Sequence, residues 1–158
     1  MRTFGGYFDD RGYYAFQTND GGFLMVRERA VRWTGNPIFL IPNTYIVKVN
    51  YFGDLQWQKF IGDSAYGNYG YTGVQDQSGN YYVTYITDRG NLAKLNSSGQ
   101  ILWTKNFPDS ITSISTIKFT SDQRYFILRG YTFVPFLGTG TISLTKTDTS
   151  GNMIWSKS

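Results

Sequence analysis

Cysteine and histidine are both absent from this chain of 158 residues. Without cysteine, neither a disulfide framework nor a thiolate metal site can form. Without histidine, the chain lacks Ser-His and Cys-His nucleophile pairs, histidine-liganded zinc sites and the usual general base near neutral pH. Catalysis would have to depend on carboxylates, lysine or tyrosine, and no pair of carboxylates stands out in the sequence. We therefore expect no enzymatic activity, no bound metal and no cofactor.

Long apolar segments are absent as well. No run of residues approaches the length that spans a bilayer, and the first residues, Met-Arg-Thr-Phe-Gly-Gly, lack the apolar stretch of a signal peptide. We expect no membrane span. The hydrophobic content of 41% is that of an ordinary globular protein with a core, so residues 1–158 are expected to form a single domain.

The net charge of +4, from 15 basic and 11 acidic residues, raises the question of nucleic-acid binding. Six of the seven lysines, however, occupy two repeated slots, and only Arg27, Arg29 and Arg32 cluster. The repeated lysines are Lys48, Lys94 and Lys146 in one slot and Lys59, Lys105 and Lys157 in the other. Because these charges are spread around the fold as scaffold features, we expect no nucleic-acid partner.

Aromatic residues make up 18% of the chain, with 13 Tyr and 12 Phe, whereas helix formers such as alanine and leucine are sparse. Aromatic and β-branched side chains favour strands, so the composition predicts an all-β fold. Three segments then align with one another, and each contains lysine, asparagine or aspartate, glycine, tryptophan and lysine at fixed offsets. The tryptophans are Trp57, Trp103 and Trp155, and the glycines are Gly53, Gly99 and Gly151.

Each aligned segment is predicted to be a β-hairpin whose turn has glycine at its third position, because such turns need a positive φ there. Pairing Asn50 with Leu55 places Lys48 opposite Trp57, and the same register places Lys94 opposite Trp103 and Lys146 opposite Trp155. We expect three equivalent contacts in which the ammonium group lies over the indole, each contributing about 0.5 to 1 kcal/mol.

A second hairpin precedes each tryptophan hairpin, so every repeat contains four strands in meander order. The tryptophans recur at intervals of about 50 residues, the length of a four-stranded propeller blade. The sequence therefore predicts a β-propeller made of four-stranded antiparallel blades, three of them in this chain. The expected blades are residues 13–62, 66–107 and 111–158, and residues 1–12 are expected to be the remnant of a fourth strand followed by a loop.

The Gly-x-x-x-Trp hairpins resemble bacterial propeller repeats of the quinoprotein-like kind and their non-enzymatic relatives of the cell envelope. The resemblance covers nearly the whole chain and implies that each Trp docks between blades beside a small turn. It also implies an extracellular or cell-envelope location. Quinoprotein dehydrogenases carry a cofactor pocket and vicinal cysteines, which this chain cannot supply, so their activity is not expected here.

Three blades are too few for a closed ring, because propellers have four to eight. An open array would expose an apolar blade face at each end. We expect the chain to associate with itself, most simply as a dimer that forms a six-bladed ring, or to be part of a longer protein.

Long connections at one edge of the blades are the expected binding surface, because loops on a rigid scaffold commonly carry function. These are residues 31–43, 61–70 and 133–140, and they are rich in aromatic residues. The expected ligand-binding residues are Arg32, Trp33, Phe39, Tyr66, Tyr69, Phe133 and Phe136. The alternative is that these side chains pack over the blade ends or the central channel.

The sequence therefore favours a non-enzymatic interaction or scaffold module, part of a bacterial or viral surface or secreted assembly, that binds a protein partner through its long loops. The alternative is a lectin-like propeller that binds glycans by stacking sugars on Trp33 and the loop tyrosines.

The lectin alternative predicts that the chain binds at least one sugar on a glycan array and that Trp33→Ala abolishes this binding, because the indole supplies the stacking surface. Binding that survives the substitution would argue against Trp33 as the sugar site.

Overall fold

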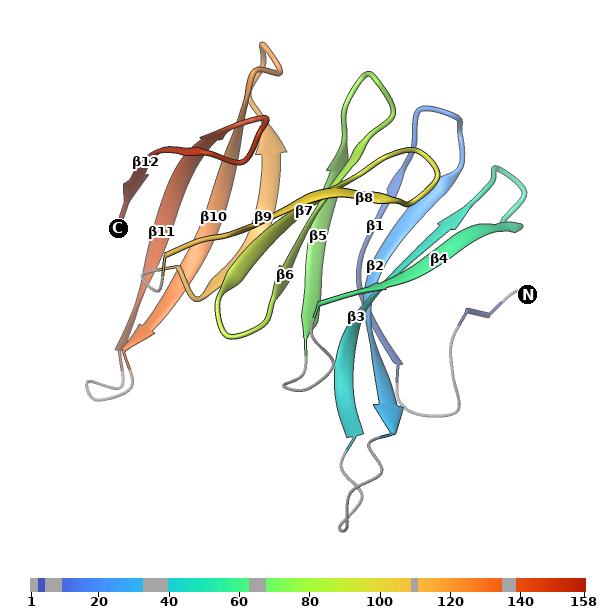
Figure 1. The fold of residues 1–158 in the computed structure, drawn as a ribbon, viewed down its shortest axis with the longest axis horizontal. Coiled ribbons are helices and arrows are strands. Elements are labelled where there is room, and N and C mark those ends of the chain that lie inside the picture. Colours follow the sequence, from blue (N-terminus) through green and yellow to red (C-terminus); the bar gives the residue numbers. More distant parts are fainter. Residues whose placement is uncertain (1–2, 5–9, 33–39, 63–67, 109–110, 135–138) are drawn as a thin grey trace.

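The computed structural model describes residues 3–4, 10–32, 40–62, 68–108, 111–134 and 139–158. These residues form twelve β-strands and contain no helix. The strands make three separate four-stranded sheets, each of them antiparallel and in simple meander order (Figure 1). The predicted all-β fold with three four-stranded repeats is thus confirmed.

The first sheet contains β1 (Asp10–Gln17), β2 (Phe23–Arg32), β3 (Leu40–Val49) and β4 (Leu55–Ile61). The second contains β5 (Tyr69–Gln75), β6 (Tyr81–Ile86), β7 (Gly90–Leu95) and β8 (Ile101–Asn106). The third contains β9 (Ser113–Phe119), β10 (Tyr125–Val134), β11 (Thr139–Asp148) and β12 (Met153–Lys157).

The pairing of the third and fourth strands repeats in all three sheets. Lys48 pairs with Trp57, Lys94 with Trp103 and Lys146 with Trp155. The expected pairing of Asn50 with Leu55 is wrong, because Val49 takes Leu55 as its partner and the Asn50 amide bonds to the Asp54 carbonyl at 2.9 Å. A bulge at Gln56 then restores the register, since a bulge places two residues of one strand opposite one of the other.

A second irregularity also recurs, in the first strand of each sheet. The register shifts between Gly12 and Tyr14 in β1, and between Gly70 and Thr72 in β5. In the third sheet it shifts where Gly130 pairs with Ile114 and Arg129 with Thr116. Because both bulges recur, residues of the three sheets can be matched one to one, and we use this equivalence below.

The three sheets stack face to face in chain order. β5 contacts β1, β2 and β3 of the first sheet, and β9 contacts β5, β6 and β7 of the second. The first strands β1, β5 and β9 therefore lie in a row, and the N- and C-termini lie at opposite ends of the array (Figure 1). We call the face that a sheet turns toward the preceding sheet its leading face, and the opposite face its trailing face.

Apolar side chains fill both junctions between sheets. At the first junction, Leu24, Val26 and Ile46 pack against residues of the second sheet that include Tyr81 and Val83. At the second junction, side chains of the second sheet meet a cluster on the third that includes Phe126 and Leu128. All of these side chains are at most 2% exposed. Each sheet of the array thus has apolar positions on both faces, and the hydrophobic effect holds neighbouring sheets together.

The leading face of the first sheet has no sheet against it in the described part of the chain. Tyr45, Val47 and Val49 form a small buried cluster there, and Phe4 and Met25 pack against it. Phe4 and Thr3 lie outside the strands. The sequence predicted a strand remnant and a loop at residues 1–12. Of these, residues 1–2 and 5–9 lie outside the described residues, and Asp10–Gly12 belong to β1.

Candidate functional site

At the first junction, Trp57 of β4 lies against the turn between β7 and β8. A Cβ atom built on Gly99 would come within 2.8 Å of two carbon atoms of the Trp57 indole. The indole Nε1 donates a hydrogen bond to the Ser97 carbonyl at 3.0 Å. Gly99 also has a φ of +79°, which side chains rarely adopt. Glycine is therefore needed twice at this position, for the turn and for the close approach of the indole.

At the second junction the same contact recurs one repeat later. A Cβ atom on Gly151, whose φ is +80°, would come within 3.1 Å of the Trp103 ring and 2.8 Å of Lys105 Cγ. The tryptophan of each sheet thus docks on the turn glycine of the next. This contact recurs between equivalent positions of separate sheets, so it fixes how far one sheet can slide past the other.

The third copy of this pair has no partner in the described structure. A Cβ atom on Gly53 would meet nothing within 4 Å, although its φ of +79° matches the other two. Trp155 is half-buried in β12, and its indole lies on the trailing face of the last sheet. One end of the array therefore carries an unused glycine turn, and the other end carries an unused tryptophan.

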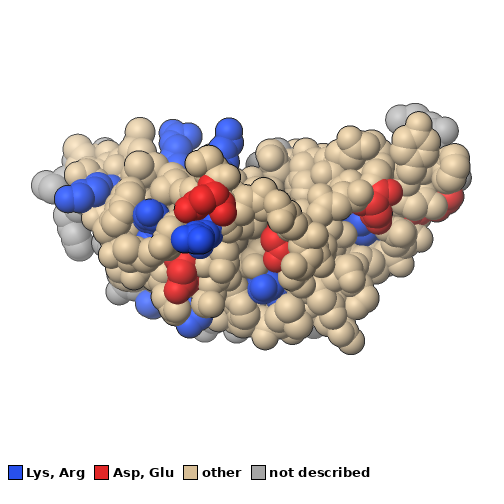
Figure 2. Space-filling view, turned by 90° about the horizontal axis from the view of Figure 1, so that it is seen from above, with Lys and Arg blue, Asp and Glu red and all other residues tan. Residues whose placement is uncertain are grey.

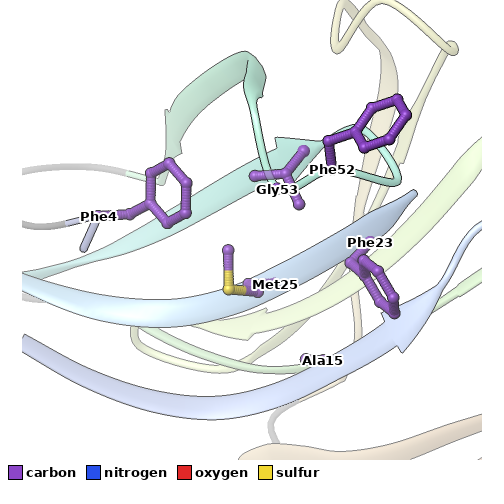
Figure 3. Close-up of a pocket in the computed structure, with 7 residues that line it drawn as sticks. Phe4, Ala15, Phe23, Met25, Phe52 and Gly53 are labelled. Carbon is purple, nitrogen blue, oxygen red and sulfur yellow. The ribbon is translucent and has the colours of Figure 1, made fainter. Parts of the chain in front are cut away.

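Beside Gly53, the leading face of the first sheet is hollowed into a groove of about 520 Å³. Figure 3 shows that the side chains lining it are apolar. The lining residues are Phe4, Ala15, Phe23, Met25, Val49, Phe52 and Gly53. Phe23 is 38% exposed and Phe52 77% exposed. An apolar groove of this kind binds apolar or aromatic groups, because its walls gain by losing contact with water.

Next to the groove, two arginines lie over aromatic rings on the same sheet. Arg29 Cζ is 5.2 Å from the Tyr45 ring centroid and 5.4 Å from that of Phe60, and Arg27 Cζ is 5.5 Å from the Tyr45 ring. Arg27 also donates to the Phe4 carbonyl. Arg27 and Arg29 thus cluster as the sequence indicated, in contact with aromatic rings of their own sheet.

The three equivalent lysines have different partners, although each sits opposite its tryptophan. Lys94 Nζ is 5.1 Å from the Tyr82 ring centroid and Lys146 Nζ is 4.0 Å from the Tyr125 ring. Lys48 Nζ instead donates to Asp20 Oδ2 and to the Val49 carbonyl, both at 2.9 Å. The expectation of three equivalent lysine-indole contacts is therefore wrong, because each ammonium group faces a different neighbour within its own sheet.

Lys48 and Asp20 form an ion pair in which only the carboxylate reaches solvent. The lysine side chain is 1% exposed and the aspartate side chain 52% exposed. The hydrogen bond from the Thr18 hydroxyl and the bond from Lys48 lower the pKa of Asp20 from 3.8 to about 2. The carboxylate is thus ionised at all but very low pH and neutralises a buried ammonium group.

Other carboxylates accept hydrogen bonds within turns, and two buried phenols have raised pKa values. Asp76 and Asp148 accept bonds from the amides of Asn80 and Asn152, both at 2.8 Å, so these segments are hairpin turns as expected. Burial raises the pKa of Tyr81 to about 12 and raises that of Tyr82 further, so both phenols stay protonated. In the described ranges, no group of three acidic side chains could hold a metal ion.

The residues expected to bind a ligand fall mostly outside the described part of the chain. The four residues that lie outside the described ranges are Trp33, Phe39, Tyr66 and Phe136. Arg32, Tyr69 and Phe133 were expected in loops, but they belong to β2, β5 and β10. The expected loop bounds were wrong because strand pairing extends further, as far as Arg32 with Leu40, Tyr69 with Ile86 and Val134 with Thr139. A role of these three residues in binding stays a prediction. Tyr69 is 39% exposed.

The surface around the turns carries no broad area of one charge. Figure 2 views the edge at which the tight turns emerge, and acidic and basic side chains lie close to one another there within a mainly uncharged surface. Among the described residues, no helix is long and apolar enough to cross a membrane.

The features that the described residues do bring together are the tryptophan-glycine contacts and the groove at Gly53. No pattern in the sequence pointed to the groove, because its walls come from β1, β2, the end of β3, the turn after it and Phe4.

No model of a known protein family matches the sequence, and no curated protein matches it. Among solved structures, a protein of unknown function from Bacteroides caccae aligns with a TM-score of 0.49 and 10% sequence identity. The alignment covers 92% of this chain and 60% of the other protein, so this chain spans well under two thirds of its length. A likeness at this level carries no argument about function, and the resemblance to bacterial propeller repeats stays a prediction.

The contact between Trp57 and Gly99 can be separated from the turn geometry by a matched pair of substitutions. Gly99→Ala should lower the free energy of unfolding by about 2 to 4 kcal/mol, because it adds both backbone strain and a clash with the indole. Gly79→Ala should cost only about 1 kcal/mol, because Gly79 has a similar φ of +83° but its Cβ would have no neighbour closer than 3.8 Å. Urea denaturation measures both, and equal losses would contradict the contact.

The ion pair predicts a pH-dependent loss. Asp20→Asn should lower the free energy of unfolding at pH 7 by about 1 to 2 kcal/mol, less than for a fully buried pair because Asp20 is half-exposed. The lowered pKa of Asp20 stabilises the fold above its unfolded value of 3.8, and this contribution disappears as pH falls through about 2. Denaturation of both proteins across this range should therefore show their stabilities converging at acid pH. A difference independent of pH would rule out the ion pair as its source.

Proposed function

We propose that the three sheets are blades of a β-propeller and that the chain is a non-enzymatic interaction module. The observation that carries the blade arrangement is the tryptophan-glycine contact, repeated between consecutive sheets at Gly99 and Gly151. Consecutive four-stranded meanders that stack face to face, with their first strands in a row, are the construction of propeller blades. The same contact at each junction gives each pair of sheets the same relative placement, which radial repetition requires.

The two edges of the array support a scaffold role. Tight turns join the first two and the last two strands of every sheet. Backbone hydrogen bonds close each turn, and in several turns the side-chain oxygen of an aspartate or asparagine also accepts a bond from a backbone amide. The connections at the other edge vary in length, from the short 87–89 to the longer 33–39 and 62–68. One edge is thus uniform, and the other differs from sheet to sheet. Binding to a protein partner is proposed for the variable edge.

The chemistry of the described residues fits an interaction module better than an enzyme. The carboxylates of Asp20, Asp76 and Asp148 are held by turn amides or by Lys48, and the buried phenols of Tyr81 and Tyr82 stay protonated. A catalytic acid or base needs a pKa near the working pH and access to substrate. The shifted groups here have pKa values that move away from neutrality.

The proposal predicts that protein partners touch the variable edge and not the uniform one. A photoreactive amino acid replacing Tyr69, which is 39% exposed near the variable edge, should crosslink a discrete partner from an extract of the source cells. The same group replacing Ser98, an exposed residue of a tight turn, is the control and should give no such product. Mass spectrometry identifies and quantifies the crosslinked products. Crosslinking of equal yield at both positions, or at Ser98 alone, would contradict the proposed binding edge.

A further inference from the structure

The two ends of the array carry the two complementary halves of the contact that joins its sheets. At the first junction, Trp57 docks on Gly99 and its ring centroid lies 5.7 Å from that of Tyr81. The cluster on which it packs also contains Leu95. By the one-to-one match of the sheets, Gly99, Tyr81 and Leu95 of the second sheet correspond to Gly53, Phe23 and Val49 of the first. These three residues line the groove.

The groove is therefore a docking socket of the same design as the one that holds Trp57. We call Gly53, Phe23 and Val49 the Gly53 socket. The side chains that line it are apolar, and Tyr51 in its turn is the counterpart of Ser97, whose carbonyl accepts the bond from Trp57. In Figure 3 the aromatic rings of Phe4, Phe23 and Phe52 and the side chain of Met25 border the hollow beside Gly53. An indole ring fits such a site in size and in chemistry.

The trailing face of the third sheet carries exposed apolar side chains at the positions that are buried in the two junctions. Leu144 corresponds to Ile46 and Leu92, which are both 0% exposed because the following sheet covers them, whereas Leu144 is 44% exposed. Ile142 beside it is 60% exposed, and Trp155 occupies the slot of Trp57 and Trp103. The face has the apolar positions of a junction without a sheet to cover them.

Arg129, a charged residue on the trailing face of the third sheet, also has a site with room for it on the leading face of the first sheet. Arg129 takes the place of Val26, which lies against Gly70 so closely that a Cβ there would be 2.7 Å from Val26 Cγ1. Gly12 is the counterpart of Gly70 at the open end, and nothing lies within 4 Å of its Cβ position. Arg129 on the trailing face of the third sheet is thus matched by Gly12 on the leading face of the first sheet, where there is room for a large side chain.

We propose that a second copy of this chain covers these faces, with Trp155 of one copy docked in the Gly53 socket of the other. The indole would lie against Gly53 and Phe23, with its Nε1 donating to the Tyr51 carbonyl, as Trp57 does to Ser97. This inference rests on the proposed arrangement of the sheets as blades. The contact is head to tail, because the knob and the socket are at opposite ends of one chain.

The number of copies follows from the number of sheets. Propellers close with four to eight blades, and six is the multiple of three in that range. Two copies related by a two-fold axis make six blades, with two identical Trp155-Gly53 contacts between the third sheet of one copy and the first sheet of the other. The ring then has no uncovered apolar sheet face.

Sedimentation velocity and light scattering on the whole chain test this assembly. The wild-type chain should be a dimer, and Trp155→Ala should raise its dissociation constant by at least about 100-fold, as expected for a buried aromatic anchor. Leu102→Ala removes another exposed apolar side chain, 52% exposed on β8, and should leave the dimer intact. A wild-type chain that stays monomeric, or that grows beyond two copies with concentration, would overturn the proposal.

A mixing experiment distinguishes head-to-tail docking from other dimers and shows that the variants fold. Gly53→Leu fills the socket and should be monomeric, whereas Gly79→Leu, with the same positive φ outside the groove, should dimerise like the wild type. A mixture of Trp155→Ala and Gly53→Leu chains regains one intact contact, so it should form a one-to-one complex. A dimer that Gly53→Leu leaves unchanged, or a mixture without complex, would overturn the inference.

Failure of this inference and failure of the proposed blade arrangement give different results. If the chain were monomeric but Gly99→Ala still lost more stability than Gly79→Ala, the contact between sheets would stand and the second copy would be excluded. If Gly99→Ala and Gly79→Ala lost equal stability, the contact on which both proposals rest would itself be absent.

Discussion

Every sheet in this chain has apolar side chains on both faces, and this requirement for cover on two sides governs the rest of the structure. A sheet with one apolar face can bury it by packing against a single partner, whereas a sheet with two must lie between neighbours. The second sheet satisfies the requirement, with Val83 buried against the first sheet and Leu92 against the third. Linear stacking follows directly, and in the described structure it leaves the Gly53 groove at one end and the trailing face of the third sheet at the other.

Apolar burial alone does not fix the placement of one sheet on another, because it has no direction. The contact of Trp57 with the Gly99 turn supplies that direction. A ring of fixed shape meets a backbone that has no side chain in the way, and its N–H has one carbonyl acceptor, on Ser97. The same arrangement of Trp103 on Gly151 shows that this placement is a property of the repeat. An array ordered in this way holds its long connections together at one edge.

The repeated lysines show how far equivalence in sequence extends. Lys48, Lys94 and Lys146 hold the same register, but the residue that faces each ammonium differs. Asp20 lies beside Lys48 in the first sheet, whereas the rings of Tyr82 and Tyr125, at positions that do not match Asp20, lie beside Lys94 and Lys146. Register is set by backbone pairing and turn geometry, which the repeat preserves. The partner of a long side chain is set by neighbours outside the repeated positions, so it varies.

The sequence by itself determined the strands, the tight turns and the pairing of each lysine with its tryptophan, because alternation and turn glycines act between residues close in the chain. It did not determine the bulge at Gln56, the length of β2 or the partner of any indole. Those were decided by tertiary structure, since Trp57 and Gly99 belong to different sheets and no local pattern links them. The Gly53 groove likewise exists only once β1, β2 and the β3–β4 turn have come together.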